Sequence, residues 1–257
     1  MGPDLIVPRG VENRVAIDMV VEHVKRTLKE KSRKHQEHLQ RLGEQVEDEP
    51  LSDNVVLLQQ TKQVIGMSTI IQNPATQEVD FIFYFDRLAS LLVERALENL
   101  HFSPWKVATP QNKEYQGLKW AGEISAVIIL RGGSCLETGL RRVIPECKSG
   151  RVLIQTNDRT GEPELHYLKL PTDMAAHDGV LLLDPQMSSG GAALMAVRVL
   201  VDHGVSEERI VFVTYFAGKV GVNRLINVFP KVKVVVARIV EDCQERWVEK
   251  RAINLAG

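Results

Sequence analysis

The chain has 257 residues, of which 44% are hydrophobic and 25% are charged, and its formal net charge is −1. This is the composition of an ordinary globular protein with room for one large core, and the near-neutral charge argues against a nucleic-acid partner. No apolar run approaches the roughly 18 residues of a membrane span, and the chain opens with no signal-peptide pattern, so no membrane partner is expected. The three cysteines, Cys135, Cys147 and Cys243, are widely spaced, which predicts a cytoplasmic protein without a metal site.

Residues 1–50 differ in composition from the rest, and we predict an amino-terminal helical segment there, followed by one domain over 51–257. Apolar residues at a spacing of four predict a long helix over 15–42. In its second half lysine and arginine alternate with glutamate, which favours a solvated helical linker over a nucleic-acid-binding stripe. The acidic run over 44–49 before Pro50 predicts the boundary.

The next part of the chain is predicted to be mostly helical. Residues 54–67 indicate a mixed helical segment, and residues 86–100 an amphipathic helix with Asp86 as its N-cap. The stretch 105–120 is expected to be irregular. The predicted inward side chains of the second helix are Leu88, Leu91, Leu92 and Ala96.

Short apolar runs alternate with helical patterns through the rest of the chain. The runs with the continuous apolar character of strands buried on both faces cover 124–130, 180–183, 210–216 and 232–239. Residues 151–156 and 165–170 alternate instead and flank the turn-rich NDRTGEPE, which predicts a projecting β-hairpin. We therefore expect an α/β fold with a doubly wound, mostly parallel sheet that binds ligands at the carboxyl ends of its strands.

The strand over 180–183 is followed by DPQMSSGGA over 184–192 and then by a helical pattern. Glycines let the backbone approach a ligand closely, and the free N–H groups of a helix amino terminus suit an anion such as phosphate. Short Ser/Gly loops also occur in plain strand-to-helix turns, so a phosphate site and an ordinary turn are both open at this point.

This loop resembles the ribose-phosphate loop of the type I phosphoribosyltransferases, specifically the uracil phosphoribosyltransferase branch, which writes it DPMLATGGS. Five of the nine positions agree when Ser189 is counted as a match to the family threonine. The resemblance extends over 54–239 and implies a type I phosphoribosyltransferase-like fold. It also implies a reaction of uracil with phosphoribosyl pyrophosphate that gives UMP and pyrophosphate, with Mg²⁺ bound through the phosphoribosyl pyrophosphate.

The resemblance implies a role for each part of the loop. Asp184 is expected to accept hydrogen bonds from the ribose hydroxyls and to be the catalytic residue, and an ordinary loop carboxylate is the alternative. Where the family has serine, Ala192 lacks one hydroxyl donor. The residues expected to bind the 5-phosphate are Ser188, Ser189, Gly190, Gly191 and Ala192.

Arg131 follows a predicted buried strand, in the place where the family sequence ILRAG forms the pyrophosphate loop. The sequence here is ILRGG, so Arg131, Gly132 and Gly133 are expected to bind pyrophosphate, and a surface arginine in a salt bridge is the alternative. The second pyrophosphate arginine of the family falls on Thr156, whose neutral hydroxyl does not replace a guanidinium. Arg159 substitutes for it only if the hairpin tip folds inward.

The family recognises uracil with a GLGDAGDR-like segment, and nothing like it occurs after Val240. The chain ends instead with EDCQERWVEKRAINLAG, which is charged and helical in pattern. Losing this segment removes the feature that makes uracil the substrate. Two hypotheses follow: an active uracil phosphoribosyltransferase, or a degenerate domain that binds a nucleotide, a phosphoribosyl ligand or only proteins, in regulation or oligomerisation.

Residues 4–24 are similar to the last segment of uridine kinases, in which a strand ending in PRG leads into the terminal helix. Long-form uridine kinases carry a uracil phosphoribosyltransferase-like domain directly after that segment. The resemblance implies a role in pyrimidine salvage, with the kinase domain of the same parent chain as a partner, and the family implies a homo-oligomer. The chain has no GxxxxGK[ST] motif for ATP, and its Met1-Gly2 start is expected to be a truncation of a longer kinase.

Overall fold

The computed structural model describes residues 50–157 and 162–241. The predicted helix over 15–42, the kinase-like segment, Arg159 and the charged carboxyl-terminal segment lie outside these residues. Within the described part of the chain, no helix combines the length and the hydropathy needed to cross a membrane.

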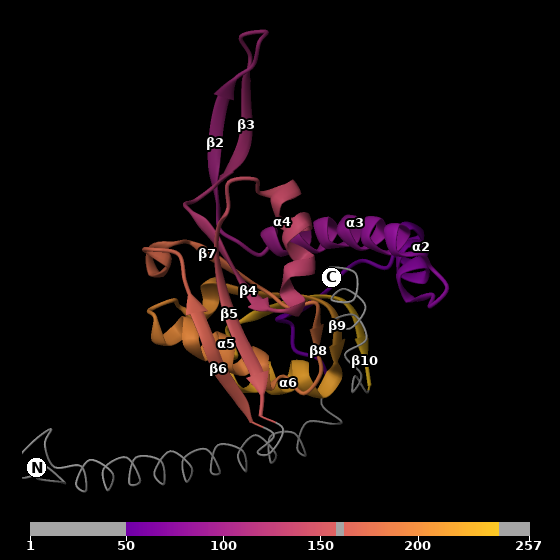
Figure 1. Ribbon diagram of the computed structural model, residues 1–257. Coiled ribbons are helices and arrows are strands. Elements are labelled where there is room, and N and C mark those ends of the chain that lie inside the picture. Colours follow the sequence, from indigo (N-terminus) through magenta and orange to yellow (C-terminus); the bar gives the residue numbers. More distant parts are fainter. Residues whose placement is uncertain (1–49, 158–161, 242–257) are drawn as a thin grey trace, which may run out of the picture. The chain divides into compact units, whose positions relative to one another are not determined.

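One large sheet organises the described domain (Figure 1). Its strand order is β1-β10-β9-β7-β4-β5-β6, and the short β8 continues the pairing along β9. All neighbours are parallel except β5 and β6, which are antiparallel. The strands are β1 (Val55–Leu57), β4 (Ile124–Leu130), β5 (Lys148–Thr156), β6 (Pro163–Lys169), β7 (Gly179–Leu183), β8 (Gln186–Met187), β9 (Ile210–Gly218) and β10 (Lys233–Val240).

Helices cover both faces of this sheet. On one face, Leu181 and Leu183 of the central strand β7 belong to the apolar core that α3 and α4 close. Helices α5 and α6 contact each other and the sheet strands β5, β6, β9 and β10. The predicted doubly wound, mostly parallel α/β fold is thus confirmed. The helices are α2 (Lys62–Gln72), α3 (Glu78–Leu97), α4 (Glu137–Val143), α5 (Gly191–Asp202) and α6 (Lys219–Val228), with 3₁₀ turns η2 (Gly132–Leu136), η3 (Met174–Ala176) and η4 (Glu207–Arg209).

The central strands are apolar on both faces, as the continuous runs predicted. Leu182 of β7 lies between Val127 of β4 and Phe212 of β9, and all three side chains are buried. A strand with helices on both faces needs apolar residues at every position, because neither set of alternate side chains reaches water. Because β4, β7 and β9 are parallel neighbours, their carboxyl ends lie at the same edge of the sheet. The candidate site described below lies at this edge.

Helix α3 starts earlier than the sequence predicted. It runs from Glu78 with Gln77 at its N-cap, so the prediction of Asp86 as the N-cap is wrong. Two further turns are helical because Phe81 and Phe85 continue the inward apolar face. Asp86 instead lies buried mid-helix, with its Oδ2 3.2 Å from an Nη2 of Arg142 on α4. Burial raises the pKa of this carboxyl, and the Arg142 charge opposes the shift.

Two other expectations for the first half of the domain are corrected. The segment over 54–67 is not continuously helical, because Val55–Leu57 pairs as an edge strand with β10 and α2 starts only at Lys62. Leu91, expected to point inward from α3, is 39% exposed. Its neighbour Leu92 is fully buried, so the apolar face of the helix is narrower than predicted.

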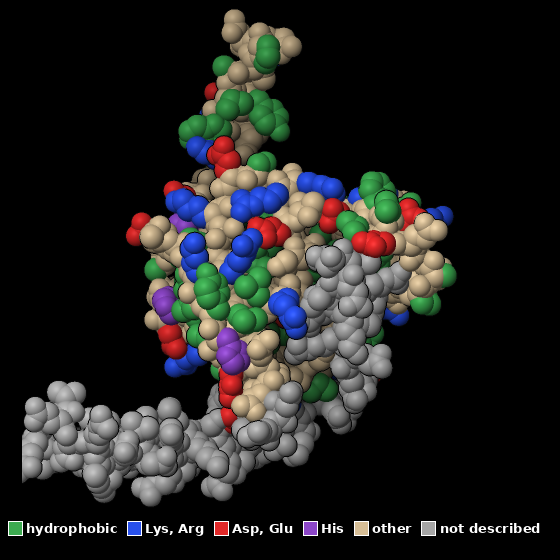
Figure 2. All heavy atoms as spheres, in the orientation of Figure 1, with side chains coloured by type: hydrophobic (Ala, Val, Ile, Leu, Met, Phe, Trp, Pro, Cys, Tyr) green, Lys and Arg blue, Asp and Glu red, His purple; other side chains and the backbone are tan. Residues whose placement is uncertain are grey.

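The stretch expected to be irregular forms a second antiparallel hairpin, β2 (Phe102–Ala108) with β3 (Glu114–Trp120). The β2–β3 hairpin projects away from the main sheet (Figure 1). The hairpin predicted over 151–170 also forms, as β5–β6, and its strands are the last two of the main sheet. Figure 2 shows apolar side chains gathered on the projecting hairpin. Cross-strand pairing puts exposed apolar groups on both of its faces, namely Trp105, Val107 and Tyr115 on one and Phe102, Leu118 and Trp120 on the other.

Candidate functional site

Asp184 stands where β7 ends, at the carboxyl edge of the sheet. Its backbone N–H donates to the carbonyl oxygen of Val213 at 3.1 Å, and its side chain is half-buried. The carbonyl oxygen of Pro185 then accepts from the N–H groups of Tyr215 and Phe216 at 3.2 and 3.1 Å. These hydrogen bonds hold the backbone of Asp184 and Pro185 against β9, and so fix the position from which the Asp184 side chain extends.

The loop after this turn leads directly into α5. Gly190 caps the helix with φ of 81°, a left-handed conformation that glycine adopts without a steric penalty. Its carbonyl oxygen accepts the first intrahelical hydrogen bond, from Leu194 at 2.8 Å. No acidic side chain lies in the first turn of α5, so the N–H groups and the positive end of the helix dipole are available to an anion.

A cleft brings most of the predicted residues together. Asp184 and the whole loop from Ser188 to Ala192 line it, together with Gly132 from η2 and Thr156 from the end of β5. Asp184 is the one ionisable side chain in this lining, so an anion here is met by N–H and hydroxyl groups. The remaining lining residues are Ile129, Leu130, Ile154, Gln186, Met187 and Ala193.

Only part of the predicted pyrophosphate loop lines the cleft. Gly132 does, whereas Arg131 is exposed at the start of η2, after a cis peptide bond with Leu130, and is not among the lining residues. Gly133 is buried, and a Cβ there would lie 2.5 Å from the carbonyl oxygen of Leu183. Gly133 thus lets η2 pack onto the end of β7, directly before Asp184.

Thr156 is among the residues that line the cleft. It ends β5, and the pairing of Thr156 with Pro163 brings the start of β6 to the same place. A Cβ on Gly191 would lie 3.8 Å from the Pro163 ring, so this strand pair forms one wall beside the loop from Ser188 to Ala192. Thr156 therefore brings a neutral hydroxyl, and no positive charge, to this wall of the cleft.

The residues of β8 and α6 that support the backbone of the loop from Ser188 to Ala192 were not identified from the sequence. Gln186 and Met187 are buried and form β8 along β9. On α6, Gly221 packs against the loop backbone, and Arg224 donates from Nη1 to the carbonyl oxygen of Ser189 at 2.8 Å. No local signal marks Arg224, because its partner is far away in the sequence, whereas Gly221 in a helical pattern is a recognisable sign of close packing.

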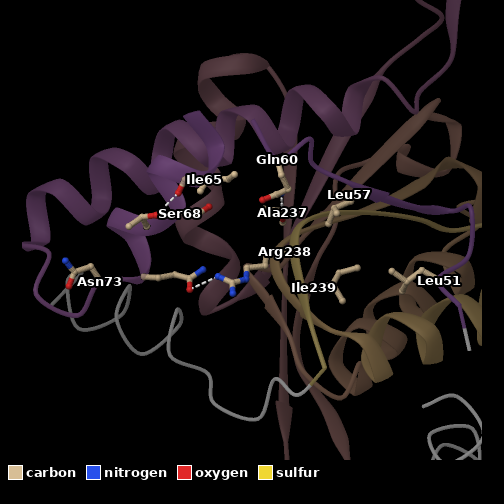
Figure 3. A pocket seen from close by; sticks show the side chains of 11 residues that line it. Leu51, Leu57, Gln60, Ile65, Ser68, Asn73, Ala237, Arg238 and Ile239 are labelled. Atoms are coloured by element: carbon tan, nitrogen blue, oxygen red, sulfur yellow. Dashed lines mark hydrogen bonds between the residues drawn. The ribbon is translucent and has the colours of Figure 1, made fainter. Parts of the chain in front are cut away.

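A larger groove of about 760 Å³ lies apart from this cleft, where α2 meets β1 and β10 (Figure 3). Its polar side chains are engaged with the protein itself. Arg238 donates from Nη1 to Oε1 of Gln72 at 2.8 Å, and Nε2 of Gln60 donates to the carbonyl oxygen of Ala237 at 2.9 Å. Because none of the predicted site residues lines this groove, the smaller cleft is the candidate site.

Comparison with known proteins agrees with the fold. The family model for uracil phosphoribosyltransferase matches residues 56–253. Uridine-cytidine kinase-like 1 of Mus musculus is 43% identical over 245 residues, which cover 92% of this chain and 42% of the mouse protein. Uracil phosphoribosyltransferase of Dictyostelium discoideum is 43% identical over 194 residues, which cover 76% of this chain and 89% of that protein.

The solved structure of the AQ2163 protein from Aquifex aeolicus has the same fold, with a TM-score of 0.64 and 24% identity, over 75% of this chain and 90% of that one. The chain spans about half the length of the curated uridine kinases it matches. It covers most of the length of the transferase from Dictyostelium. This chain therefore belongs to the uracil phosphoribosyltransferase family, in a form that is also found within uridine kinases.

Proposed function

We propose that this chain is the phosphoribosyl-binding domain of a uridine kinase in pyrimidine salvage. Its cleft would hold the ribose 5-phosphate part of UMP or of phosphoribosyl pyrophosphate. The observation that carries the proposal is the meeting of Asp184, the loop from Ser188 to Ala192 and Gly132 in one cleft at the strand ends. The relatives' names support a uracil nucleotide as the ligand class.

Each part of the ligand has a partner in this cleft. The 5-phosphate accepts hydrogen bonds from the N–H groups at the start of α5 and from the hydroxyls of Ser188 and Ser189. Asp184 accepts hydrogen bonds from the ribose hydroxyls, because an ionised carboxylate is an acceptor only. The cleft thus combines a loop rich in hydrogen-bond donors with the Asp184 carboxylate as an acceptor. This combination matches a sugar phosphate better than a free phosphate.

Magnesium fits this cleft only as a companion of the ligand. No cluster of three or more metal-binding side chains occurs in the part of the chain that the structure describes, and Asp184 is the one carboxylate lining the cleft. Mg²⁺ is often held by one or two carboxylates plus substrate phosphates. We propose that it arrives on the pyrophosphate oxygens, where it would neutralise their charge.

Binding and transfer make different demands on the site. Transfer also needs the departing pyrophosphate to be stabilised, and neutral Thr156 together with exposed Arg131, which does not line the cleft, leaves little positive charge to do so. We propose that the domain retains ligand binding and has lost most of its transferase activity, so that it acts as a regulatory module for the kinase domain of its parent chain. The cysteine pattern supports a cytoplasmic location.

Calorimetry of the chain with UMP, uridine and magnesium phosphoribosyl pyrophosphate tests the proposal. Both phosphorylated ligands are expected to bind, and uridine, which lacks the 5-phosphate, is expected to bind at least 100-fold more weakly, a difference of about 3 kcal/mol. Equal affinity for UMP and uridine, or no binding of either, would contradict it.

An active uracil phosphoribosyltransferase is the second candidate, supported by the retained loop. Incubation with uracil, phosphoribosyl pyrophosphate and Mg²⁺ separates the two. Little or no UMP from a folded chain that binds UMP is expected under the first proposal, whereas repeated turnovers would favour the second. Unchanged kinase regulation in a parent enzyme lacking residues 51–257 would argue against a regulatory role.

The projecting hairpin supports the proposal that the protein is a homo-oligomer. Two strands alone are marginally stable, and among the described residues no core covers β2 and β3 to bury their apolar side chains. Leu118 is 70% exposed and Trp105 is 51% exposed on the opposite face. A second copy of the chain would remove both from water if it enclosed the hairpin from both faces, and we propose that it does.

Replacing Trp105 and Leu118 together by serine is expected to shift the protein toward the monomer without unfolding the sheet. Each substitution removes an apolar contact of the proposed interface and leaves the main core untouched. Size-exclusion chromatography with light scattering gives the mass, and circular dichroism checks the fold. Val79→Ser is the matched control, because Val79 is 77% exposed on α3. An unchanged mass for the double variant would rule out the hairpin as the interface.

A further inference from the structure

Helix α6 packs against the loop from Ser188 to Ala192, which we call the phosphate loop. In the sequence the two are separated by α5 and β9. The contact is made backbone to backbone by two glycines. A Cβ on Gly221 would lie 2.2 Å from the carbonyl oxygen of Ser188 and 3.1 Å from the nitrogen of Gly190. Conversely, a Cβ on Gly190 would lie 2.8 Å from the carbonyl oxygen of Gly221. The loop therefore sits on the first turn of α6 at a distance that only glycine permits.

Arg224 extends this contact with a hydrogen bond. It lies on the same face of α6 as Gly221, and its Nη1 donates to the carbonyl oxygen of Ser189 at 2.8 Å. The guanidinium is half-buried, its Nε is buried without a hydrogen-bond partner among the described residues, and burial lowers its pKa. A hydrogen bond from a charged donor is stronger than one between neutral groups.

This bond sets the orientation of one peptide plane in the loop. In a trans peptide the carbonyl oxygen and the following N–H point in opposite directions. Because the Ser189 carbonyl points to Arg224, the N–H of Gly190 points away from Arg224. Gly190 lines the cleft, whereas Arg224 does not. The side chain on α6 therefore acts on the site through the loop and not by touching a ligand.

We infer that Arg224, seated by the Gly190–Gly221 contact, is a positioning residue that holds the phosphate loop in its binding conformation before the ligand arrives. A preformed loop spares the ligand the entropy loss of ordering it. The inference deepens the proposed function and rests on it for its effect on affinity. Its effect on the loop in the ligand-free protein is independent of any ligand.

Two measurements on Arg224→Met test the inference. The methionine keeps an apolar stem but has no donor, so UMP affinity by calorimetry is expected to fall by about 10- to 100-fold, the worth of one hydrogen bond to a charged group. Hydrogen exchange of the ligand-free protein, read by mass spectrometry on peptides that span 186–194, is expected to accelerate there and to stay unchanged in β7 and β9. Arg224→Lys keeps a charged donor and is expected to recover affinity to within about threefold of the original.

Arg198→Met is the matched control. Arg198 lies on α5 and its Nε is 3.1 Å from Asp202 in an exposed ion pair that does not reach the loop. Its substitution is expected to leave both readouts unchanged. If Arg224→Met proves unstable, Arg224→Gln provides the same comparison. Glutamine is polar, which suits this half-buried position, but it is uncharged and too short to reach the Ser189 carbonyl oxygen.

The outcomes separate the two proposals. If the original chain does not bind UMP, the proposed function fails, and exchange in the loop still decides the role of Arg224. Equal loop exchange in the original and Met chains would overturn the inference, as would equal UMP affinity. Loss of affinity that Arg224→Lys does not restore would also overturn it, because a donor at this position would then not be what matters.

Discussion

Asp184→Ala is expected to weaken UMP binding by about 100- to 1000-fold, which corresponds to roughly 3–4 kcal/mol. Asp184 is the one carboxylate that lines the cleft, and the ribose offers it two hydroxyl donors. Each hydrogen bond to a charged group contributes about 1.5–3 kcal/mol, so the loss of both explains the size of the effect. The fold should survive, because the Asp184 backbone N–H keeps its bond to Val213.

A ligand without ribose hydroxyls provides the control for this substitution. The original chain and Asp184→Ala are expected to bind 2′,3′-dideoxyuridine 5′-monophosphate equally, since neither makes a hydroxyl–carboxylate bond with it. Calorimetry with both ligands and both chains completes a double-mutant cycle. Equal weakening for UMP and the dideoxy nucleotide would mean that Asp184 acts on the phosphate loop and not on the ribose, contrary to the proposal.

Gly133→Ala is expected to lower the free energy of unfolding by about 2–3 kcal/mol, at the upper end of the cost of overpacking a core. The new methyl group would lie 2.5 Å from the carbonyl oxygen of Leu183 and 3.0 Å from Cγ2 of Ile128. Leu183 sits in β7 between β4 and β9, where its register pairs it with Ile128 and Val213. The strand has little freedom to yield, so η2 must move away.

Urea unfolding followed by circular dichroism measures this change. Because η2 and Asp184 flank the same carbonyl, the displaced chain is also expected to bind UMP more weakly. Gly66→Ala is the matched control. Nothing lies within 4 Å of a Cβ at Gly66 in α2, and alanine there should stabilise the helix by about 0.5–1 kcal/mol. Equal stability of the Gly133 variant and the original chain would show that the contact relaxes at no cost.

The central sheet and the phosphate loop were predictable from local patterns. The runs that form β4, β7, β9 and β10 are apolar at nearly every position, which is what burial on both faces demands. The loop from Asp184 to Ala192 combines a strand end, glycines and a helix start within one short stretch. Such signals survive in the sequence because the atoms that need each other are neighbours along the chain.

The hairpin of β2 and β3 was not predictable in this way. Its residues are exposed at nearly every position, so no alternation between a buried and a solvated face marks the strands. The start of α3 was missed for a related reason. Its first two turns carry Phe81, Phe85 and other aromatic residues, which are common in strands, and only packing against the sheet shows that they share a helical face.

The sequence by itself determined the parallel α/β class, the strand ends at which the candidate site lies, and the residue types of the loop from Asp184 to Ala192. Tertiary structure alone decided that Thr156 and Asp184 line one cleft, that exposed Arg131 does not line it, and that Arg224 bonds to the loop from α6. The reason is physical: local periodicity encodes which face of an element is buried. Contacts between distant elements depend instead on strand order and on close backbone approach, which a single sequence does not spell out.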